Sequence, residues 1–480
     1  MPLLIALSGW RGQSGVVRGQ PALRAFLLGL ITGVAYFVGT VYWTGAVLSE
    51  FGGLPRPLAI VAMLLLALYL AIYPAIFAVL FARLVARAGA PALLLAPPVW
   101  VATEFLRGYV FGGFPWVPLG NSQVTVLPVV QIASLFGVYG VSLVVAFVNA
   151  AIAFALLESG RARITVVVSV AGLLIAVAGW GTWRIADGSL TREGTPIRVG
   201  LIQGNVAQED KLNLTPQIAR RILTTYIAMT RDAVRRGAEY VIWPESSTPF
   251  GFDESAIGQQ ALRDLAREVR VPLLVGSDHL EMGPPPVQYN SAFQLSPNGE
   301  TAAIYNKMHL VPFGEFIPLQ QWISFVAPLV KRFLPFSEGK SSVMLPVGSH
   351  RASTSICYEV VFPALVRDAV NMGSELLTTI TNDGWYGHSS APYQHFELAS
   401  MRAIEQGRYL ARAANTGISG VVDPYGRVVA RSGIFEQVGM VEEVRFLSTR
   451  TLYARIGDVV SYASMIITLV ALVAVRKRAA

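Results

Sequence analysis

Long apolar runs constrain the fold of this chain more than any other feature of its sequence. A helix of about 20 apolar residues crosses the roughly 30 Å hydrocarbon core of a bilayer. Six stretches meet this requirement, at residues 22–48, 57–81, 91–109, 128–157, 164–185 and 456–475. Charged residues make up only 14% of the chain, well below the share typical of soluble globular proteins. The sequence therefore predicts a polytopic α-helical membrane domain.

The uneven distribution of charge divides the chain. Before residue 187 the acidic residues are Glu50, Glu104 and Glu158, and lysine is absent. From residue 191 to residue 455, charged residues, prolines and turn residues appear at the density of an ordinary globular protein. We therefore predict a transmembrane helical domain at 1–190, a globular domain at 191–455, and a C-terminal transmembrane helix with a short tail at 456–480.

Basic residues predict the orientation in the membrane, because short cytoplasmic loops carry an excess of lysine and arginine. Clusters of these residues flank alternate ends of the predicted spans, at Arg11, Arg18, Arg24, Arg83, Arg87, Arg161, Arg163, Arg476, Lys477 and Arg478. With every cluster inside, five crossings place the globular domain outside the cytoplasm. The net charge of +8 owes much to these loops, and no basic groove with interleaved aromatic residues predicts binding to nucleic acid.

Strand and helix patterns alternate in the globular domain. Amphipathic helices are predicted at 217–237 and 261–270, and buried strands at 197–206, 238–246, 271–278 and 374–385. A hairpin at 289–307 turns at Pro297, Asn298 and Gly299, a strand at 350–362 runs into a helix near Pro363, and further strands occupy 408–432. This alternation predicts an α/β fold in which helices cover layered sheets.

Three polar residues follow the ends of predicted strands: Glu245 after "YVIWP", Lys307 after "AIYN", and Cys357 after "TSI". Each alone is more readily explained as a strand cap or, for the cysteine, as an inert core residue. Cys357 is the only cysteine in the chain, so it forms no internal disulfide. A carboxylate can take the proton of a thiol as the sulfur attacks, and a fixed ammonium stabilises the oxyanion that forms at a carbonyl. Together the three residues suffice for acyl transfer through a thioester.

The motifs around these residues resemble a known pattern. "WPES", "YNKMHLVPFGEFIP" and "ICYE" resemble the Glu-Lys-Cys motifs of the nitrilase superfamily. "TEFLRGYVFGGFPW" among the membrane spans, and "TNDGWYG" with "QHFELASMRAIEQGRYLARAANTGISGVVDPYG" as a later loop and strands, narrow the resemblance to the apolipoprotein N-acyltransferase family. The resemblance implies a nitrilase-like α-β-β-α sandwich on the periplasmic side of the bacterial inner membrane.

The resemblance also implies a ping-pong reaction and assigns roles. Cys357 attacks an acyl ester of a phospholipid, and the α-amine of a diacylglyceryl-cysteine then attacks the thioester. Glu245 is the implied general base, Lys307 supports the oxyanion, and Glu315 orients the lysine or shares the proton transfer. Two further family-matched pocket residues are Tyr358 and Glu359, and Trp385 and Tyr386 lie in a glycine-flanked segment predicted to form a lid.

The expected partners are a phospholipid acyl donor, a diacylated apolipoprotein acceptor and the bilayer, with the enzyme acting as a monomer. No cofactor or metal is expected, since the histidines show no ligand spacing; they are His279, His309, His350, His388 and His395. Two alternatives remain. A membrane-tethered amidase or nitrile hydrolase uses the same three residues with water as acceptor, and a lipid-binding protein has no catalytic use for Cys357.

Polar and aromatic residues of the membrane part allow two interpretations each. Glu104 and Arg107 lie on one face of a predicted helix, either facing a cavity or extending to the membrane surface as an interfacial pair. Phe111, Phe114 and Trp116 are interpreted as part of an interfacial aromatic belt, with a lipid entrance as the alternative.

Overall fold

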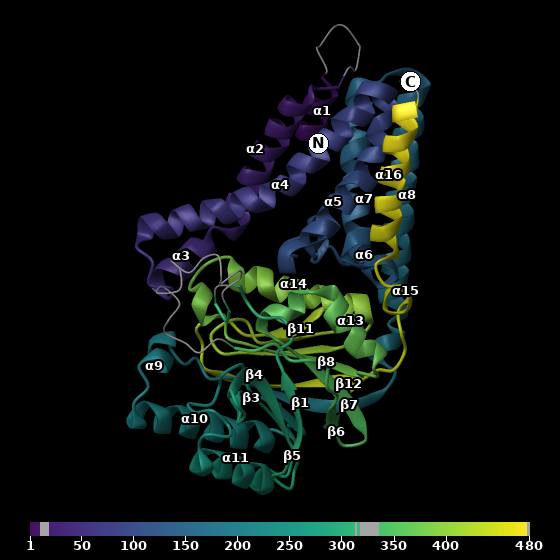
Figure 1. Cartoon of the computed structure of the whole chain (residues 1–480). Helices are drawn as coiled ribbons and strands as arrows, with labels where there is room; N and C mark the ends of the chain where they lie inside the picture. The colour runs from purple at the N-terminus through teal and green to yellow at the C-terminus, as the bar shows by residue number, and fades with distance from the viewer. Residues whose placement is uncertain (10–18, 313, 317–335, 478–480) are drawn as a thin grey trace. The chain divides into compact units, whose positions relative to one another are not determined.

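A computed structural model describes residues 1–9, 19–312, 314–316 and 336–477. The described chain forms two compact units (Figure 1). The first comprises residues 1–46, 55–187 and 455–480, and the second comprises 47–54 and 188–454. Three basic residues used to predict orientation, Arg11, Arg18 and Arg478, lie outside the described residues.

Helices build the first unit. Five of those described are long and apolar enough to cross a membrane: α2 (Ala22–Val41), α4 (Arg56–Ala88), α7 (Ala133–Leu157), α8 (Gly160–Asp187) and α16 (Val459–Lys477). Shorter helical segments are α1 (Pro2–Ser8), η2 (Ala90–Leu95), α5 (Ala96–Arg107), η3 (Val110–Gly112), η4 (Leu119–Gln123) and α6 (Leu127–Val130). The helices α3 (Trp43–Glu50) and α15 (Leu452–Ile456) each contain residues of both units. The five long helices are consistent with a membrane protein.

The predicted span at 91–109 is helical from Ala90 to Arg107, but it is not a single α-helix. This stretch forms the 3-10 segment η2 followed by α5, whose α-helical part has only 12 residues. Pro97 and Pro98 stand at the start of α5. Proline has no backbone N–H to donate and favours the first turn of a helix, so these residues begin a new helix rather than extend one.

Glu104 and Arg107 hold a loop of the first unit. Both side chains are buried, and Arg107 Nη1 donates to the carbonyls of Phe114 and Trp116 at 2.6 and 2.8 Å. Glu104 Oε1 accepts from the backbone N–H of Leu119 at 2.7 Å. These bonds satisfy backbone groups of an irregular segment, so the pair is structural here rather than an interfacial pair reaching for solvent.

The aromatic residues assigned to an interfacial belt differ in their exposure to solvent. Phe111 is 88% exposed, as expected of a belt residue, whereas Trp116 is fully buried. The Trp116 ring packs against Trp43 with ring centroids 5.1 Å apart. Trp116 is therefore a core residue of the first unit, which corrects its assignment to an interfacial belt.

Two six-stranded sheets build the second unit (Figure 1). The strands of the first sheet, in spatial order, are β12 (Val438–Phe446), β1 (Thr195–Gln203), β2 (Tyr240–Ile242), β3 (Leu273–Glu281), β4 (Val287–Leu295) and β5 (Thr301–Asn306). Those of the second are β11 (Val428–Arg431), β10 (Gly420–Val422), β9 (Leu410–Ala414), β8 (Leu376–Thr381), β7 (His350–Ile356) and β6 (Leu345–Val347). The strands β1, β2 and β3 run parallel, as do β7, β8 and β9.

Helices cover the outer faces of the two sheets. The helix α10 (Pro216–Arg235) packs on β1, β2 and β12, and α11 (Ala256–Val269) packs on α10. On the other side, α13 (Pro363–Asn371) packs on β7 and α14 (Ala391–Gln406) on β9, while β1 contacts β9 between the layers. The second unit is therefore an α-β-β-α sandwich, with short segments α9 (Gln208–Leu212), η5 (Ser189–Thr191), η6 (Cys357–Val361) and η7 (Asp383–Tyr386) in its loops.

Local sequence explains why the covering helices form. Thr215 caps α10 by accepting a hydrogen bond from the Ile218 N–H, and Pro216 occupies the first turn. The buried residues of α10 are Ile222, Tyr226, Thr230 and Ala233, spaced three or four apart. One helix was not predicted: residues 391–406, between the strands predicted at 374–385 and 408–432, form α14.

Candidate active site

The structure places the three predicted residues just beyond strand ends. Glu245 lies three residues past β2, Lys307 directly follows β5, and Cys357 directly follows β7. All three side chains are buried. Lys307 Nζ is 3.4 Å from Glu245 Oε1 and 2.8 Å from Glu315 Oε1. A buried ammonium between two carboxylates is a paired charge rather than a strand cap.

Asn290 on β4 joins the two carboxylates. Its Nδ2 donates to Glu245 Oε1 at 2.7 Å and to Glu315 Oε1 at 2.9 Å. The second oxygen of Glu315 accepts from the Val311 N–H at 2.7 Å. Burial opposes charging of Lys307, but Glu315 and Glu245 outweigh it and raise the pKa of the ammonium above its ordinary value. The lysine therefore remains charged in a dry site.

Backbone contacts fix where the Glu245 carboxylate points. Its Oε2 accepts from the Asn382 N–H at 2.8 Å, in the loop that follows β8. On the neighbouring strand β3, Gly276 packs directly against the backbone of Pro244 and Glu245. A Cβ at this position would lie only 2.3 Å from the carbonyl oxygen of Pro244, so a larger residue would displace this backbone. Glu245 is thus held from both sheets, as general-base chemistry requires.

Cys357 occupies a strained turn. Its φ is +53°, in the left-handed region that non-glycine residues rarely adopt. Burial and the Glu245 carboxylate raise the pKa of the thiol well above its ordinary value, and Lys307 offsets this only in part. The sulfur is therefore a protonated thiol at neutral pH, and a base must take its proton before or during attack.

Glu359 links the cysteine turn to the lysine loop. Its Oε1 accepts from the hydroxyl of Tyr305 at 2.8 Å and from the N–H of Met308 at 2.6 Å, and its Oε2 accepts from the Ile356 N–H at 2.7 Å. Burial raises its pKa to about 7, against the effect of these donors. Tyr358 packs edge-on against Phe362 at 5.1 Å between ring centroids. Both residues support the turn that carries Cys357.

The predicted lid residues belong to η7. Trp385 and Tyr386 are partly buried. The Trp385 ring meets Phe51 edge-on at 5.2 Å between centroids, and the Tyr386 ring meets His395 edge-on at 6.2 Å. The Tyr386 ring therefore lies against a residue that contacts the backbone of the cysteine.

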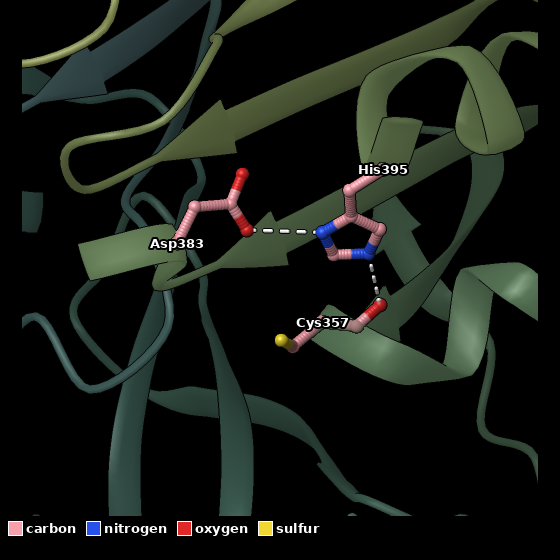
Figure 2. Close-up of side chains that lie close together, drawn as sticks. All are labelled: Cys357, Asp383 and His395. Carbon is pink, nitrogen blue, oxygen red and sulfur yellow. Dashed lines mark hydrogen bonds and ion pairs between the residues drawn. The ribbon is translucent and has the colours of Figure 1, made fainter. Parts of the chain in front are cut away.

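A histidine and an aspartate lie beside Cys357 (Figure 2). The potential ligand atoms of Cys357, Asp383 and His395 lie within 4.8 Å of one another, close enough to suggest a metal site. However, Arg412 Nη2 donates to Asp383 Oδ2 at 2.8 Å, and His395 Nε2 bonds the Cys357 carbonyl at 3.1 Å. A guanidinium on the carboxylate disfavours a cation, so these residues fit a hydrogen-bond network better than a metal centre.

Sequence reasoning missed several residues of the site. They are Asn290, Asn382, Asp383, His395 and Arg412, together with Lys211, whose Nζ donates to the Ser246 carbonyl at 2.9 Å. The partners in these five bonds lie 12 to 137 residues away. Local sequence gave one signal for these residues. Asn382 and Asp383 follow the buried strand β8, just as Glu245 follows β2.

We expect replacement of Lys307 by methionine to destabilise the second unit by about 3–5 kcal/mol, because removal of one member of a buried ion pair leaves uncompensated charge. Here two carboxylates, Glu245 and Glu315, would face each other. Thermal unfolding in detergent measures the loss. The double variant Lys307→Met/Glu315→Gln should recover part of the stability and none of the activity; equal stability of the single and double variants would contradict this electrostatic account.

Two family models match the chain. The carbon-nitrogen hydrolase family matches residues 198–446, which include every site residue described above. The apolipoprotein N-acyltransferase N-terminal domain matches residues 2–151. The predicted combination of an α-helical membrane domain with a nitrilase-like sandwich is therefore confirmed.

Similar proteins cover nearly the whole chain. An apolipoprotein N-acyltransferase of Geobacter metallireducens is 36% identical over 447 residues, which are 92% of this chain and 85% of the relative. Another, of Shewanella oneidensis, is 32% identical over 480 residues, or 95% and 88%. A solved variant of an amidase from Nesterenkonia AN1, of the nitrilase superfamily, aligns with 55% of this chain and 94% of its own, at 22% identity and a TM-score of 0.42. The chain belongs to the apolipoprotein N-acyltransferase family.

Proposed function

We propose that this chain transfers a fatty acyl group from a membrane phospholipid to the N-terminal α-amine of a diacylglyceryl-cysteine on an apolipoprotein. Membership of the family supports the reaction class. The observation that carries the proposal is the buried array of Glu245, Lys307 and Glu315, in which Glu245 and Lys307 interact electrostatically with Cys357, the only thiol of the chain. Such an array supplies a proton acceptor and a fixed positive charge in a site from which water is largely excluded.

In the first half-reaction, the Cys357 sulfur attacks the ester carbonyl of the phospholipid and its proton passes to Glu245. The carbonyl oxygen becomes an oxyanion, which the Lys307 ammonium stabilises. The ester C–O bond then breaks, Glu245 returns the proton to the leaving alkoxide, and a lysophospholipid departs. The acyl group remains on sulfur as a thioester.

In the second half-reaction, the α-amine of the acceptor attacks the thioester carbonyl. Glu245 takes a proton from the amine, and Lys307 again stabilises the oxyanion. The C–S bond breaks, the thiolate recovers the proton from Glu245, and an amide is released. Because Asn290 and Glu315 hold Lys307 and Glu245 in fixed positions, neither step requires the charged groups to rearrange.

The acceptor separates this proposal from the amidase alternative. Purified protein is incubated with phospholipid and a synthetic diacylated lipopeptide that has a free α-amine, and products are measured by mass spectrometry. We expect N-acylated lipopeptide and lysophospholipid in equal amounts. Free fatty acid formed at the same rate with and without lipopeptide would instead assign the chain as a hydrolase.

We also propose that the chain lies in the bacterial inner membrane with its second unit on the periplasmic side. The basic loop residues support this orientation when η2 and α5 together count as the crossing predicted at 91–109, because clusters such as Arg83 with Arg87 and Arg161 with Arg163 then stand between alternate spans. Protease treatment of intact spheroplasts should digest residues 191–455. Protection of that segment until the membrane is opened would reverse the orientation.

The segment around Trp385 and Tyr386 is proposed to act as a lid for the lipid chain. Gly387 at its end has φ +56° and ψ −153°, a conformation that only glycine adopts readily. We expect Gly387→Ala to lower kcat by about tenfold, since the strain amounts to about 1–3 kcal/mol. Gly348→Ala is the matched control: this glycine has φ +61° in the turn between β6 and β7. Equal kinetics of the two variants would exclude the lid.

A further inference from the structure

The turn that carries Cys357 needs an external support. A non-glycine residue in the left-handed region costs about 1–2 kcal/mol and persists only when its surroundings hold it there. Cys357 has φ +53°. Its carbonyl oxygen bonds the ring of His395, on helix α14, at 3.1 Å. This contact joins the strained residue to an element of regular structure 38 residues further along the chain.

The proton positions on the His395 ring follow from its partners. A carbonyl oxygen only accepts hydrogen bonds, so Nε2 carries a hydrogen and donates it to Cys357. The other nitrogen, Nδ1, lies 3.0 Å from Arg412 Nη2 and 2.9 Å from Asp383 Oδ1. Burial and the Arg412 guanidinium lower the pKa of His395, against the opposing effect of Asp383. Asp383 and Arg412 together hold Nδ1, and they orient the ring so that Nε2 faces the Cys357 carbonyl.

Asp383 fixes the arginine in turn. Arg412 Nη2 donates to Asp383 Oδ2 at 2.8 Å, and the Thr381 hydroxyl donates to Asp383 Oδ1 at 2.9 Å. Although burial alone would raise the pKa of Asp383, Arg412 and His395 lower it to about 2, so the carboxylate is ionised at any working pH. The side chains of Asp383, His395 and Arg412 are fully buried. Because a buried ion pair adds little stability over apolar packing, its place beside the cysteine needs another explanation.

The arrangement resembles a Cys-His-Asp triad in composition but not in geometry. In a triad the ring nitrogen bonds the nucleophile itself. Here Nε2 bonds the backbone carbonyl of Cys357 rather than its sulfur (Figure 2). Since Nε2 already carries the hydrogen that it donates to this carbonyl, it does not take the thiol proton, a role that the proposed mechanism gives to Glu245.

We propose that His395 is a positioning residue, which holds the Cys357 turn so that the sulfur faces Glu245 and Lys307, and that Asp383 and Arg412 orient its ring. The inference rests on the proposal that Cys357 is the nucleophile. It does not depend on which acceptor takes the acyl group.

The test compares His395→Phe with His395→Gln. Phenylalanine keeps the ring and removes the donor, whereas the glutamine amide retains an N–H that reaches the carbonyl. A misplacement of about 1 Å costs about 100-fold in rate, so we expect His395→Phe to lower kcat by about 100-fold with KM little changed. The glutamine variant should recover most of this loss. His350→Phe, at the start of the same strand β7, is the matched control and should react like the wild type.

A second readout addresses the thiol directly. Cys357 is the only cysteine, so the rate of alkylation by iodoacetamide reports on this one sulfur without any lipid substrate. Slower alkylation in the phenylalanine variant than in the glutamine variant supports the inference, even if the acceptor assignment above fails. If both variants lose activity equally and in parallel with their thermal stability, or if the phenylalanine variant alkylates like the wild type, the inference is overturned.

Discussion

Replacement of Cys357 by serine is expected to lower acyl transfer by at least about 1,000-fold, because the nucleophile of a covalent mechanism has no substitute in the site. A serine hydroxyl has a far higher pKa than a thiol and is not activated by the same carboxylate. The side chain is close in size and the site is buried, so the fold should be retained. The measurement is the rate of lysophospholipid release from a phospholipid substrate.

The Cys357→Ser variant also distinguishes an enzyme from a lipid-binding protein without catalytic activity. Phospholipid binding by Cys357→Ser should match that of the wild type, since the sulfur contributes to chemistry rather than to affinity. Cys357→Ala, with no side-chain nucleophile, is the stricter control and should be equally inactive. If either variant keeps substantial turnover, Cys357 is a core residue and the lipid-binding interpretation is correct.

Replacement of Glu245 by glutamine should produce the second large effect, a loss of about 100- to 10,000-fold in the acylation rate. The variant keeps the shape of the side chain and removes the proton acceptor. Since the pKa of the Cys357 thiol is raised by burial and by Glu245 itself, only a small fraction is thiolate at neutral pH. That fraction rises about tenfold per pH unit below the pKa, so the variant should gain rate steadily with pH while the wild type does not.

The dependence of the acylation rate on pH is measured by stopped flow between about pH 6 and pH 9, and the protein must stay folded over this range. Glu239→Gln is the matched control, because Glu239 lies immediately before β2 and its side chain is 57% exposed. The control should follow the wild-type profile. A uniform loss in Glu245→Gln with no change in pH dependence would mean that Glu245 only holds Lys307 in place.

The parts of the fold that follow from local pattern were predictable. Long apolar runs identified the helices α2, α4, α7, α8 and α16, and alternating strands and helices identified the layered domain. The change from the 3-10 segment η2 to the α-helix α5 at Pro97 and Pro98 was not predicted, because the prediction used the hydrophobicity of the whole stretch and not the positions of its prolines. Helix α14 was missed because 13 of its 16 residues are buried, so that it lacks the polar face of a surface helix.

The candidate site was predictable only where its residues follow strands. Glu245, Lys307 and Cys357 carry that local signal, and the family motifs strengthened it. Asn290 sits within β4, and His395 within a buried helix, positions where a polar residue is indistinguishable from an ordinary hydrogen-bonded core residue. Their roles depend on which strand ends meet across two sheets, and that pairing is set by tertiary packing rather than by any local stretch of sequence.

The intact mass of the purified protein after incubation with phospholipid alone, without an acceptor, tests the central claim most directly. The account predicts a mass gain equal to one fatty acyl chain, carried on the peptide that contains Cys357, labile to hydroxylamine and discharged by a diacylated lipopeptide. No mass gain under conditions that support turnover, or an acyl group on any other peptide, would contradict it.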